Sequence, residues 1–429
     1  MPALAESPRS PVPGLSDHSP ASQPIGAERW AWRRLRRRPF SIHGWRSVRH
    51  ACSTVTCYTK ARCWCWWLVG RSPMWMLPAP HPPDGVPVID LGDCTLMPGL
   101  VDAHTHLAFD PHGPTEHQMV HDDDATVLGR MREHAARALR AGVTTVRDMG
   151  DRGYLGLRLR AEYAEDTSGP QVLAAAPPIT RSGGHCWYLG GEADDTDQLV
   201  TAVQARADHG TDLLKIMATG GMSTSGSNAA AAQYTLDELR AVTRTAHDRD
   251  LPVSAHAHAT RGITDAVAVG VDSIEHCTFM TADGVKLDPA TVDAIAAAGI
   301  FVGCTVVRPR DGMPEEVLRT IAPYWENQAY LRRRGVRVVC CTDAGISPHK
   351  PHDILPSDVA YFASQVGTNA EALASVTSLA AQACRLGHRK GRVAVGYDAD
   401  LLAVTGNPLI DINVMTQARA VFRAGKRVR

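Results

Sequence analysis

The chain has 429 residues, of which 44% are hydrophobic, enough for the core of one large α/β domain and a smaller one. Basic and acidic residues balance at 45 each, but residues 1–83 hold 12 of the basic and only 3 of the acidic ones, so the remainder is mildly acidic and a nucleic-acid partner is not expected. No apolar run approaches the roughly 20 residues of a membrane-spanning helix, no signal-peptide core is visible, and the 11 cysteines favour reduced core thiols, so we expect a cytoplasmic protein without a membrane partner.

Residues 1–83 do not follow the pattern of a folded domain, and we expect them to be irregular. Residues 1–27 are rich in Pro, Ser and Ala without periodicity, which predicts disorder. Residues 28–83 contain the basic run 33–38, and seven of the nine tryptophans lie in residues 1–83. A basic, aromatic arm that binds nucleic acid or a membrane is one interpretation of this composition. Because neither a helical nor a strand period holds, we favour a disordered or non-native segment.

Regular patterns begin near Val86, with a first strand predicted over residues 88–92. Short apolar runs then recur along the chain, each with the length of a buried strand. There are eight of them, at residues 100–106, 143–146, 172–176, 213–218, 253–258, 273–277, 301–306 and 336–341.

Helical patterns separate most of these runs. Residues 128–141, 236–248 and 292–298 are amphipathic at the helical period. Capping boxes of the form Thr-x-x-Glu mark helix starts at Thr235 and Thr368. Eight strands alternating with helices over about 250 residues predict an α/β fold, a (β/α)8 barrel of the TIM type.

The end of the chain breaks this alternation. Residues 392–404 and 420–428 have the pattern of strands on either side of a turn. We therefore predict a barrel over residues 98–387 and a small accessory β domain built from the two ends of the folded chain, residues 84–97 and 388–429.

Two histidines, His104 and His106, end the first predicted barrel strand. Alternate strand side chains share a face, so these two imidazoles lie about 7 Å apart on one side. Two imidazoles on one face can bind a divalent ion if further ligands come from elsewhere. In a chain with 19 histidines one such pair is weak evidence, so other ligands must be sought at other strand ends.

Candidate ligands do stand at the ends of other predicted strands, where a barrel of this type builds its active site. They are Lys215 on the fourth strand, His256 and His258 on the fifth, His276 on the sixth and Asp343 after the eighth. Each has an ordinary explanation when taken alone: Lys215 as a rim residue, His276 as a core histidine and Asp343 as a helix cap. Their joint occurrence at strand ends favours a metal site.

The segments that carry these residues resemble the amidohydrolase superfamily of metal-dependent hydrolases. The similarity runs from about residue 86 to the C-terminus and is nearest to the branch with imidazolonepropionase-like proteins and metal-dependent Xaa-Pro dipeptidases. The resembling segments are PGLVDAHTH at 98–106, SGGH at 182–185, LKIMATGG at 214–221, AHAH at 255–258, IEH at 274–276 and TDAG at 342–345.

The resemblance implies a centre with two divalent metal ions. Six side chains would hold them: His104, His106 and Asp343 on one ion, His256 and His276 on the other, and Lys215 with a hydroxide bridging both. In this branch the lysine is carboxylated by CO₂ on its amine. The residue chemistry agrees, because an ammonium has no lone pair for a cation whereas the carboxylated amine is an anionic oxygen donor. The ligand set suits zinc, with manganese or iron as alternatives.

Substrate contacts are less defined. Spacing does not separate His256 from His258, which share a face, and only the family pattern assigns the ligand to His256 and leaves His258 for the substrate. His185 and Tyr234 are candidates for holding a substrate carboxylate or carbonyl oxygen, since both can donate a hydrogen bond; ordinary loop residues are the alternative. Asp343 would accept the proton of the attacking hydroxide and pass it to the leaving amine.

The predicted reaction is hydrolysis of an amide or related C–N bond in a small molecule: a dipeptide, an Xaa-Pro dipeptide or an N-acyl amino acid. One alternative is a cyclic-amide hydrolase or a deaminase of the same superfamily, some of which use one metal and lack the lysine, so Lys215 argues against that form. Another is a non-catalytic barrel scaffold, against which all six filled ligand positions argue. The sequence leaves open whether the protein is a homo-oligomer.

Overall fold

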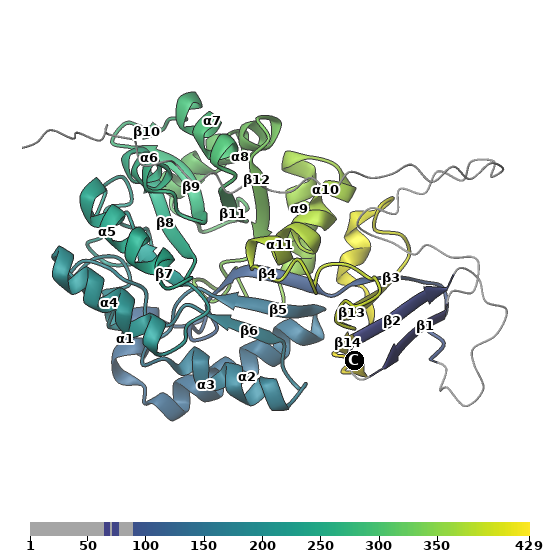
Figure 1. The fold of residues 1–429 in the computed structure, drawn as a ribbon. Helices are drawn as coiled ribbons and strands as arrows, with labels where there is room; N and C mark the ends of the chain where they lie inside the picture. Colours follow the sequence, from purple (N-terminus) through teal and green to yellow (C-terminus); the bar gives the residue numbers. More distant parts are fainter. Residues whose placement is uncertain (1–63, 69–70, 77–88) are drawn as a thin grey trace, which may run out of the picture. The chain divides into compact units, whose positions relative to one another are not determined.

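The structure is a computed structural model that describes residues 64–68, 71–76 and 89–429 (Figure 1). The chain divides into two units, Met1–His50 and Ala51–Arg429, and all described residues belong to the second. Among them no helix is long and apolar enough to cross a membrane. The expectations for residues 1–63, 69–70 and 77–88 lie outside the described residues.

Eight parallel strands form the barrel. They are β4 (Leu100–Thr105), β5 (Val143–Asp148), β6 (Gln171–Ala174), β7 (Leu214–Met217), β8 (Val253–Ala259), β9 (Ser273–Thr281), β11 (Phe301–Thr305) and β12 (Arg337–Cys341). They pair as β4-β5-β6 and as β7-β8-β9-β11-β12, and the short β10 (Gly284–Val285) pairs with the end of β9. Isolated bridges span the two seams, Ile179 to Ile216 and Thr105 to Ala344. The predicted TIM-type barrel is confirmed, with each strand within a few residues of its prediction.

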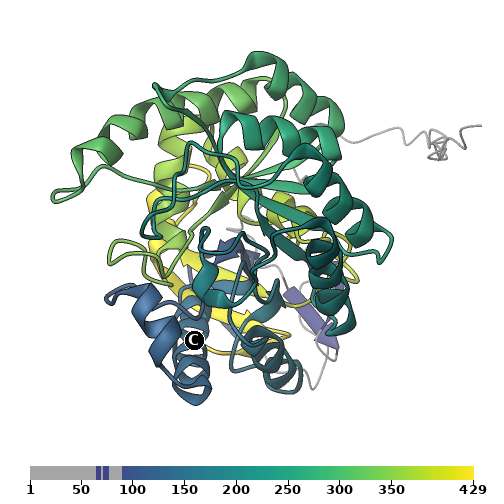
Figure 2. The ribbon, with the colours of Figure 1, turned by 90° about the vertical axis from the view of Figure 1, so that its left-hand side faces the viewer.

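Helices surround the strands, as Figure 2 shows. They are α1 (Thr115–His121), α2 (Asp124–Arg140), α3 (Leu155–Glu165), α4 (Thr196–Asp208), α5 (Leu236–His247), α6 (Thr260–Val269), α7 (Pro289–Ala298), α8 (Glu315–Arg333), α9 (Leu355–Val366), α10 (Asn369–Ser375) and α11 (Ser378–Ala383), with short 3₁₀ turns η1 (Trp187–Leu189) and η2 (Ile412–Thr416). Both predicted capping boxes form, at the starts of α5 and α10. Because helices cover the strands outside and side chains fill the barrel inside, strands such as β4 and β8 are buried along their whole length.

A second sheet lies outside the barrel, in the order β15-β14-β13-β3. It joins β3 (Cys94–Pro98), just before the barrel, to β13 (Leu401–Thr405), β14 (Ala418–Arg423) and β15 (Lys426–Arg427) from the C-terminal end. Asp400, the residue before β13, accepts hydrogen bonds from Lys390 and Arg423, and all three are buried. Burial alone would raise the pKa of Asp400, but these two cations lower it, so the carboxylate stays charged.

Three predicted strands are wrong in part. The strand predicted over residues 420–428 is two antiparallel strands, β14 and β15, because Ala424 and Gly425 adopt positive φ and make a turn between them. Residues 89–92 do not form a strand, because Asp90 Oδ1 accepts a hydrogen bond from the Gly92 N–H at 2.8 Å and Gly92 adopts φ +72°, which makes a turn. The strand predicted from residue 392 begins only at Leu401, since Gly396 at φ +83° and the bond from Tyr397 N–H to Ala394 O form a turn before it.

Two short antiparallel strands, β1 (Trp64–Leu68) and β2 (Arg71–Met76), occur in the segment predicted to be irregular. The expectation that residues 1–83 are irregular therefore does not hold for these eleven positions. The division of the chain into a barrel domain and an accessory domain at the predicted boundaries stays a prediction.

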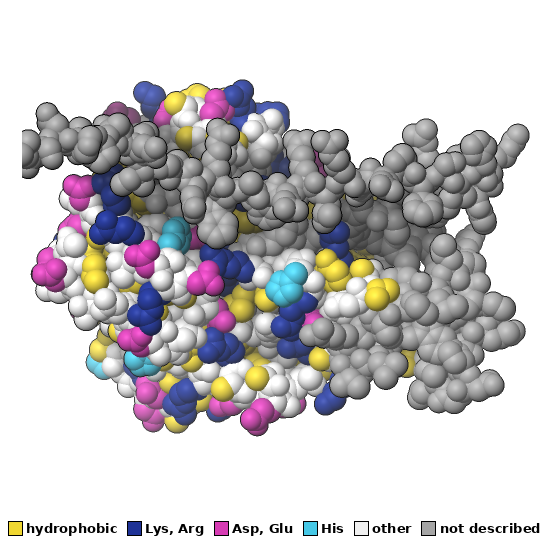
Figure 3. Space-filling model, viewed as in Figure 1, with side chains coloured by type: hydrophobic (Ala, Val, Ile, Leu, Met, Phe, Trp, Pro, Cys, Tyr) yellow, Lys and Arg dark blue, Asp and Glu magenta, His cyan; other side chains and the backbone are white. Residues whose placement is uncertain are grey.

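One face of the described residues mixes both charges. On the face shown in Figure 3, Lys and Arg side chains alternate with Asp and Glu side chains over the described part of the chain. This face therefore carries no broad field of one sign.

Candidate active site

Three predicted ligands meet where β4 ends beside the turn that follows β12. Asp343 Oδ1 lies 3.4 Å from His104 Nε2 and 3.3 Å from His106 Nε2, and all three side chains are buried. One potential ligand atom from each lies within 4.8 Å of the others. Asp102 holds the two elements together, because its carboxylate accepts hydrogen bonds from the backbone N–H groups of His104 and Thr342.

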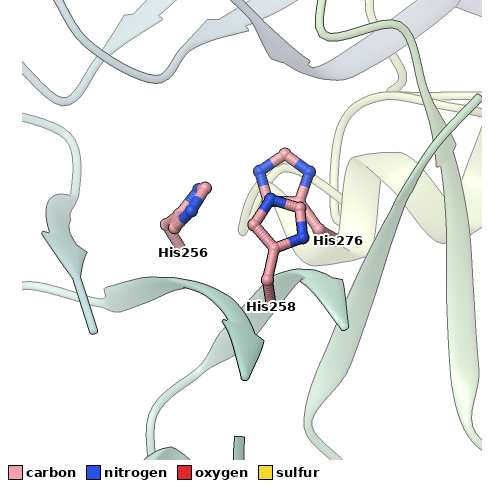
Figure 4. A group of neighbouring side chains, drawn as sticks. All are labelled: His256, His258 and His276. Atoms are coloured by element: carbon pink, nitrogen blue, oxygen red, sulfur yellow. The ribbon is translucent and has the colours of Figure 1, made fainter. Parts of the chain in front are cut away.

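A second buried cluster consists of His256 and His258 on β8 and His276 on β9 (Figure 4). The ring centroid of His276 lies 4.6 Å from that of His256 and 4.6 Å from that of His258, with which it stacks. Since all three potential ligand atoms lie within 4.8 Å of one another, the geometry brings His258 as close as His256. The assignment of the ligand to His256 stays a prediction.

One nitrogen of each ring in the second cluster has a hydrogen-bond partner. Thr278 Oγ1 lies 2.8 Å from His258 Nδ1, Thr305 Oγ1 lies 2.9 Å from His276 Nδ1, and the carbonyl of Gly220 lies 3.1 Å from His256 Nε2. These partners fix the rings and leave His256 Nδ1 and the Nε2 atoms of the other two for a ligand.

The two clusters adjoin, with 5.1 Å between the ring centroids of His104 and His276. Lys215, on β7, belongs to the same buried region: its charge contributes to lowering the pKa values of His104, His185, His256, His258 and His276. Its Nζ is buried without a hydrogen-bond partner. Burial lowers the pKa of Lys215 to about 8, although Glu275 and Asp343 act in the opposite direction.

The protonation states suit metal ligands. Burial is the main cause that lowers the pKa of His104 and of His258 to about 4, and it lowers those of His256 and His276 well below the ordinary value. These imidazoles are therefore neutral at pH 7 and keep a lone pair. Burial raises the pKa of Asp343, but its hydrogen bond with His106 and the charge of Lys350 outweigh burial and keep it ionised.

The first cluster has the form of a cation site. Glu275 Oε2 lies 2.9 Å from His104 Nδ1, and because an ionised carboxylate only accepts, Nδ1 carries the proton. His104 Nε2 is then a lone pair that faces the Asp343 carboxylate at 3.4 Å. Two such acceptors repel unless a cation lies between them, and nitrogen and oxygen ligands at this spacing suit zinc or a similar divalent ion.

Backbone strain accompanies the site. His276 and Asp343 adopt φ +68° and +55°, in the left-handed region that residues other than glycine seldom occupy. At His276 this breaks the strand alternation, so Glu275 and His276, adjacent in sequence, both contact the ring of His104.

Three residues near the site were not singled out from the sequence. Asp102 lies two residues before His104, on the same strand face, so its spacing carries a signal. Glu275 immediately precedes His276, and strand alternation would place it on the opposite face. Lys350, in the loop after β12, donates to the Thr342 carbonyl at 2.8 Å and has its Nζ 3.9 Å from Asp343 Oδ2. Only the folded loop brings it there.

The structure treats the two other substrate-contact candidates differently. The ring of His185 lies 4.5 Å from that of His256, and a Cβ on Gly221 would stand 2.4 Å from it, so glycine makes room for this histidine. Tyr234 instead donates its hydroxyl to the Ala193 carbonyl at 3.0 Å. Its substrate contact stays a prediction, and the structure gives its hydroxyl another partner.

With the site in view, comparison with known proteins decides the family. Residues 95–428 match the amidohydrolase family. The chain belongs to this family. This amidohydrolase is a hydrolytic enzyme that acts on carbon–nitrogen bonds, as predicted.

Individual relatives have low sequence identity to this chain but align over most of its length. Ochratoxinase from Aspergillus niger is 25% identical over 366 residues, which cover 77% of this amidohydrolase and 74% of the relative. Imidazolonepropionase from Colwellia psychrerythraea is 24% identical over 357 residues, covering 74% and 78%. A crystal structure of a Xaa-Pro dipeptidase with methionine bound in its active site matches with a TM-score of 0.73 and 27% identity, over 83% of this chain and 92% of that one.

Proposed function

We propose that this amidohydrolase uses two divalent metal ions to hydrolyse the amide bond of a small N-acyl amino acid or dipeptide, Xaa-Pro dipeptides included. The observation that carries the proposal is Lys215. Its amine is buried and has no hydrogen-bond partner, which is costly for an ammonium even with the charges of Glu275 and Asp343 acting on it. A carboxylated lysine between two cations removes that cost.

The proposed ligands are His104, His106 and Asp343 for one ion and His256 and His276 for the other, with Lys215 shared. When bound, two such ions, zinc by our proposal, supply an activated water at neutral pH and polarise a carbonyl. With a pKa of about 8 rather than 10.5, Lys215 exposes more neutral amine at pH 7. That amine adds CO₂ and releases one proton to give the carboxylated form.

Asp343 is the proposed proton carrier. Its Oδ1 faces His104 and His106, so Oδ2 is the atom that takes the proton of the attacking water. Lys350, 3.9 Å from Oδ2, favours the ionised acid before attack. The protonated Oδ2 then donates to the nitrogen of the leaving amine as the C–N bond breaks.

His185 and His258 are the proposed substrate contacts, because both rings lie against His256 at the mouth of the barrel. An imidazole there can donate to a substrate carboxylate or carbonyl oxygen. The similarity to a Xaa-Pro dipeptidase that binds methionine in its active site supports an amino-acid product. Similarity to imidazolonepropionase favours one second candidate, a cyclic amide as substrate.

The test is to reconstitute the metal-free enzyme with zinc and bicarbonate, count the ions, and assay dipeptides, N-acyl amino acids and cyclic amides. We expect about two ions per chain and hydrolysis of a linear amide. A Lys215→Ala variant is the control and should bind fewer ions and lose activity. One ion per chain with activity on a cyclic amide alone would favour the second candidate and contradict the first.

A further inference from the structure

Glu275 lies at the centre of a buried network inside the barrel. Its side chain is fully buried on β9, and Oε2 lies 2.9 Å from His104 Nδ1. Its other oxygen, Oε1, accepts from the Arg147 guanidinium at 3.0 Å and from the hydroxyls of Ser254 and Ser273 at 2.8 Å each. One carboxylate therefore joins residues of four barrel strands, β4, β5, β8 and β9.

Within this network, Arg147 and Glu275 define the state of His104. Arginine remains charged in proteins, so the group opposite Arg147 is a carboxylate, which accepts hydrogen bonds and donates none. The ring of His104 must then place its proton on Nδ1 and its lone pair on Nε2. That nitrogen is the one that faces His106 and Asp343 across the first cluster.

A glycine on the neighbouring strand makes room for the carboxylate. Gly303 on β11 is the cross-strand partner of Glu275, and a Cβ on Gly303 would stand 1.9 Å from Oε2. Gly303 does not adopt a left-handed backbone, so space rather than conformation requires glycine here. The atom that such a Cβ would displace is the one bonded to His104.

We propose that Glu275 is a positioning residue, which fixes the ring orientation and tautomer of His104 for metal binding, and that Gly303 provides the space this requires. The inference deepens the proposed function, on which it rests for the role of His104 as a ligand. Removing such an outer partner of a metal-binding histidine weakens metal binding by 10- to 100-fold in general.

Two variants break the His104 bond by different means: Glu275→Gln removes the charge, and Gly303→Ala pushes the carboxylate away without removing any polar atom. Ser254→Ala is the matched control, because it removes one hydrogen-bond donor to Glu275 Oε1 and leaves the bond from Oε2 to His104 untouched. Ser254 lines a cavity of about 330 Å³. Metal affinity is measured by chelator competition on the zinc enzyme, and ligand geometry by the visible spectrum of the cobalt enzyme.

We expect both variants to bind one of the two ions about 10- to 100-fold more weakly, with a changed cobalt spectrum, while Ser254→Ala stays within about twofold of the unmutated enzyme. A variant that carries both Glu275→Gln and Gly303→Ala should bind metal no more weakly than Glu275→Gln alone, because both changes act through the same hydrogen bond to His104. Should Glu275→Gln fail to fold, Gly303→Ala tests the same bond.

If the unmutated enzyme binds two ions and the Glu275→Gln and Gly303→Ala variants bind both with unchanged affinity, this inference is overturned. The proposed function would then still stand. Additive losses in the double variant would also overturn the inference. An unmutated enzyme that binds no metal would overturn the proposed function itself.

Discussion

The two clusters of candidate ligands differ in their charge and in the groups that contact their side chains. The first contains the carboxylate of Asp343 and is supported by charged groups, with Glu275 on His104 and Lys350 near Asp343. The second contains three neutral imidazoles, and its supports are the neutral hydroxyls of Thr278 and Thr305 and a backbone carbonyl.

Because of this difference, we expect metal binding at the two clusters to depend on Lys215 to different degrees. The first cluster offers a cation a fixed negative charge, whereas the three rings of the second offer lone pairs only. Carboxylation of Lys215 would supply the missing negative charge. We therefore expect the ion of the second cluster to depend on bicarbonate and that of the first cluster to be less sensitive.

Removing the carboxylate of the first cluster should have the largest effect. We expect Asp343→Asn to lower kcat by about 10²–10⁴-fold because the amide cannot take the proton from the attacking water. Metal analysis should show that ions still bind, which separates proton transfer from assembly of the site. Turnover near that of the unmutated enzyme would contradict the role of Asp343.

Replacing Lys215 should affect the second cluster most. Lys215→Met is expected to cost one ion per chain and most of the activity, and added bicarbonate should no longer raise either quantity. Atomic absorption with and without bicarbonate measures this. Two ions per chain in the variant would contradict a shared lysine ligand.

The same variant should stabilise the metal-free protein. The pKa of Lys215 falls from 10.5 to about 8 on folding, so between these pH values the unfolded chain holds a proton that the folded chain has lost. The contribution of Lys215 to the free energy of unfolding therefore rises with pH from about 8 to 10.5, and below pH 8 the folded state carries the full cost of about 3 kcal/mol for this one group. Lys215→Met removes this contribution, so the variant should exceed the unmutated protein in unfolding free energy by more at pH 7 than at pH 10, as measured by urea denaturation of both proteins.

The ambiguity inside the second cluster can be resolved by a pair of variants. We expect His256→Gln to lose the second ion, and His258→Gln to keep both ions and raise KM about tenfold through one lost hydrogen bond to substrate. Metal content and steady-state kinetics measured side by side separate the two roles. The reverse pattern would exchange the assignments.

The smallest effect is expected at Tyr234. Its hydroxyl donates to the Ala193 carbonyl, so Tyr234→Phe should cost about 1 kcal/mol of unfolding free energy and leave KM unchanged. Urea denaturation and kinetics measure the two quantities. A raised KM would instead support the substrate contact predicted from the sequence.

Sequence reasoning located the strand ends well because their signal is local. Two considerations predict that His104, His256 and Asp343 lie together. Apolar runs locate the strands, and the active site of a barrel forms at their carboxyl ends. The strand predicted at residues 88–92 failed for an equally local reason, since the Asp90 side chain captures the Gly92 N–H and makes a turn.

The supports of the site depend on tertiary structure and were missed. Glu275 contacts the same ring as its neighbour His276 only because the backbone at His276 is left-handed, which strand alternation does not anticipate. Lys350 reaches Asp343 through the path of a loop, and the pairing of Thr278 with His258 depends on the register between β8 and β9. None of these follows from spacing along one strand.

By our proposal, two cations and a carboxylated Lys215 complete these two clusters. Anomalous diffraction from crystals of the zinc enzyme grown with bicarbonate tests it most directly. We predict two zinc peaks, one among His104, His106 and Asp343 and one beside His256 and His276, with extra density on Lys215 Nζ between them. A single peak with an unmodified Lys215 would contradict the account.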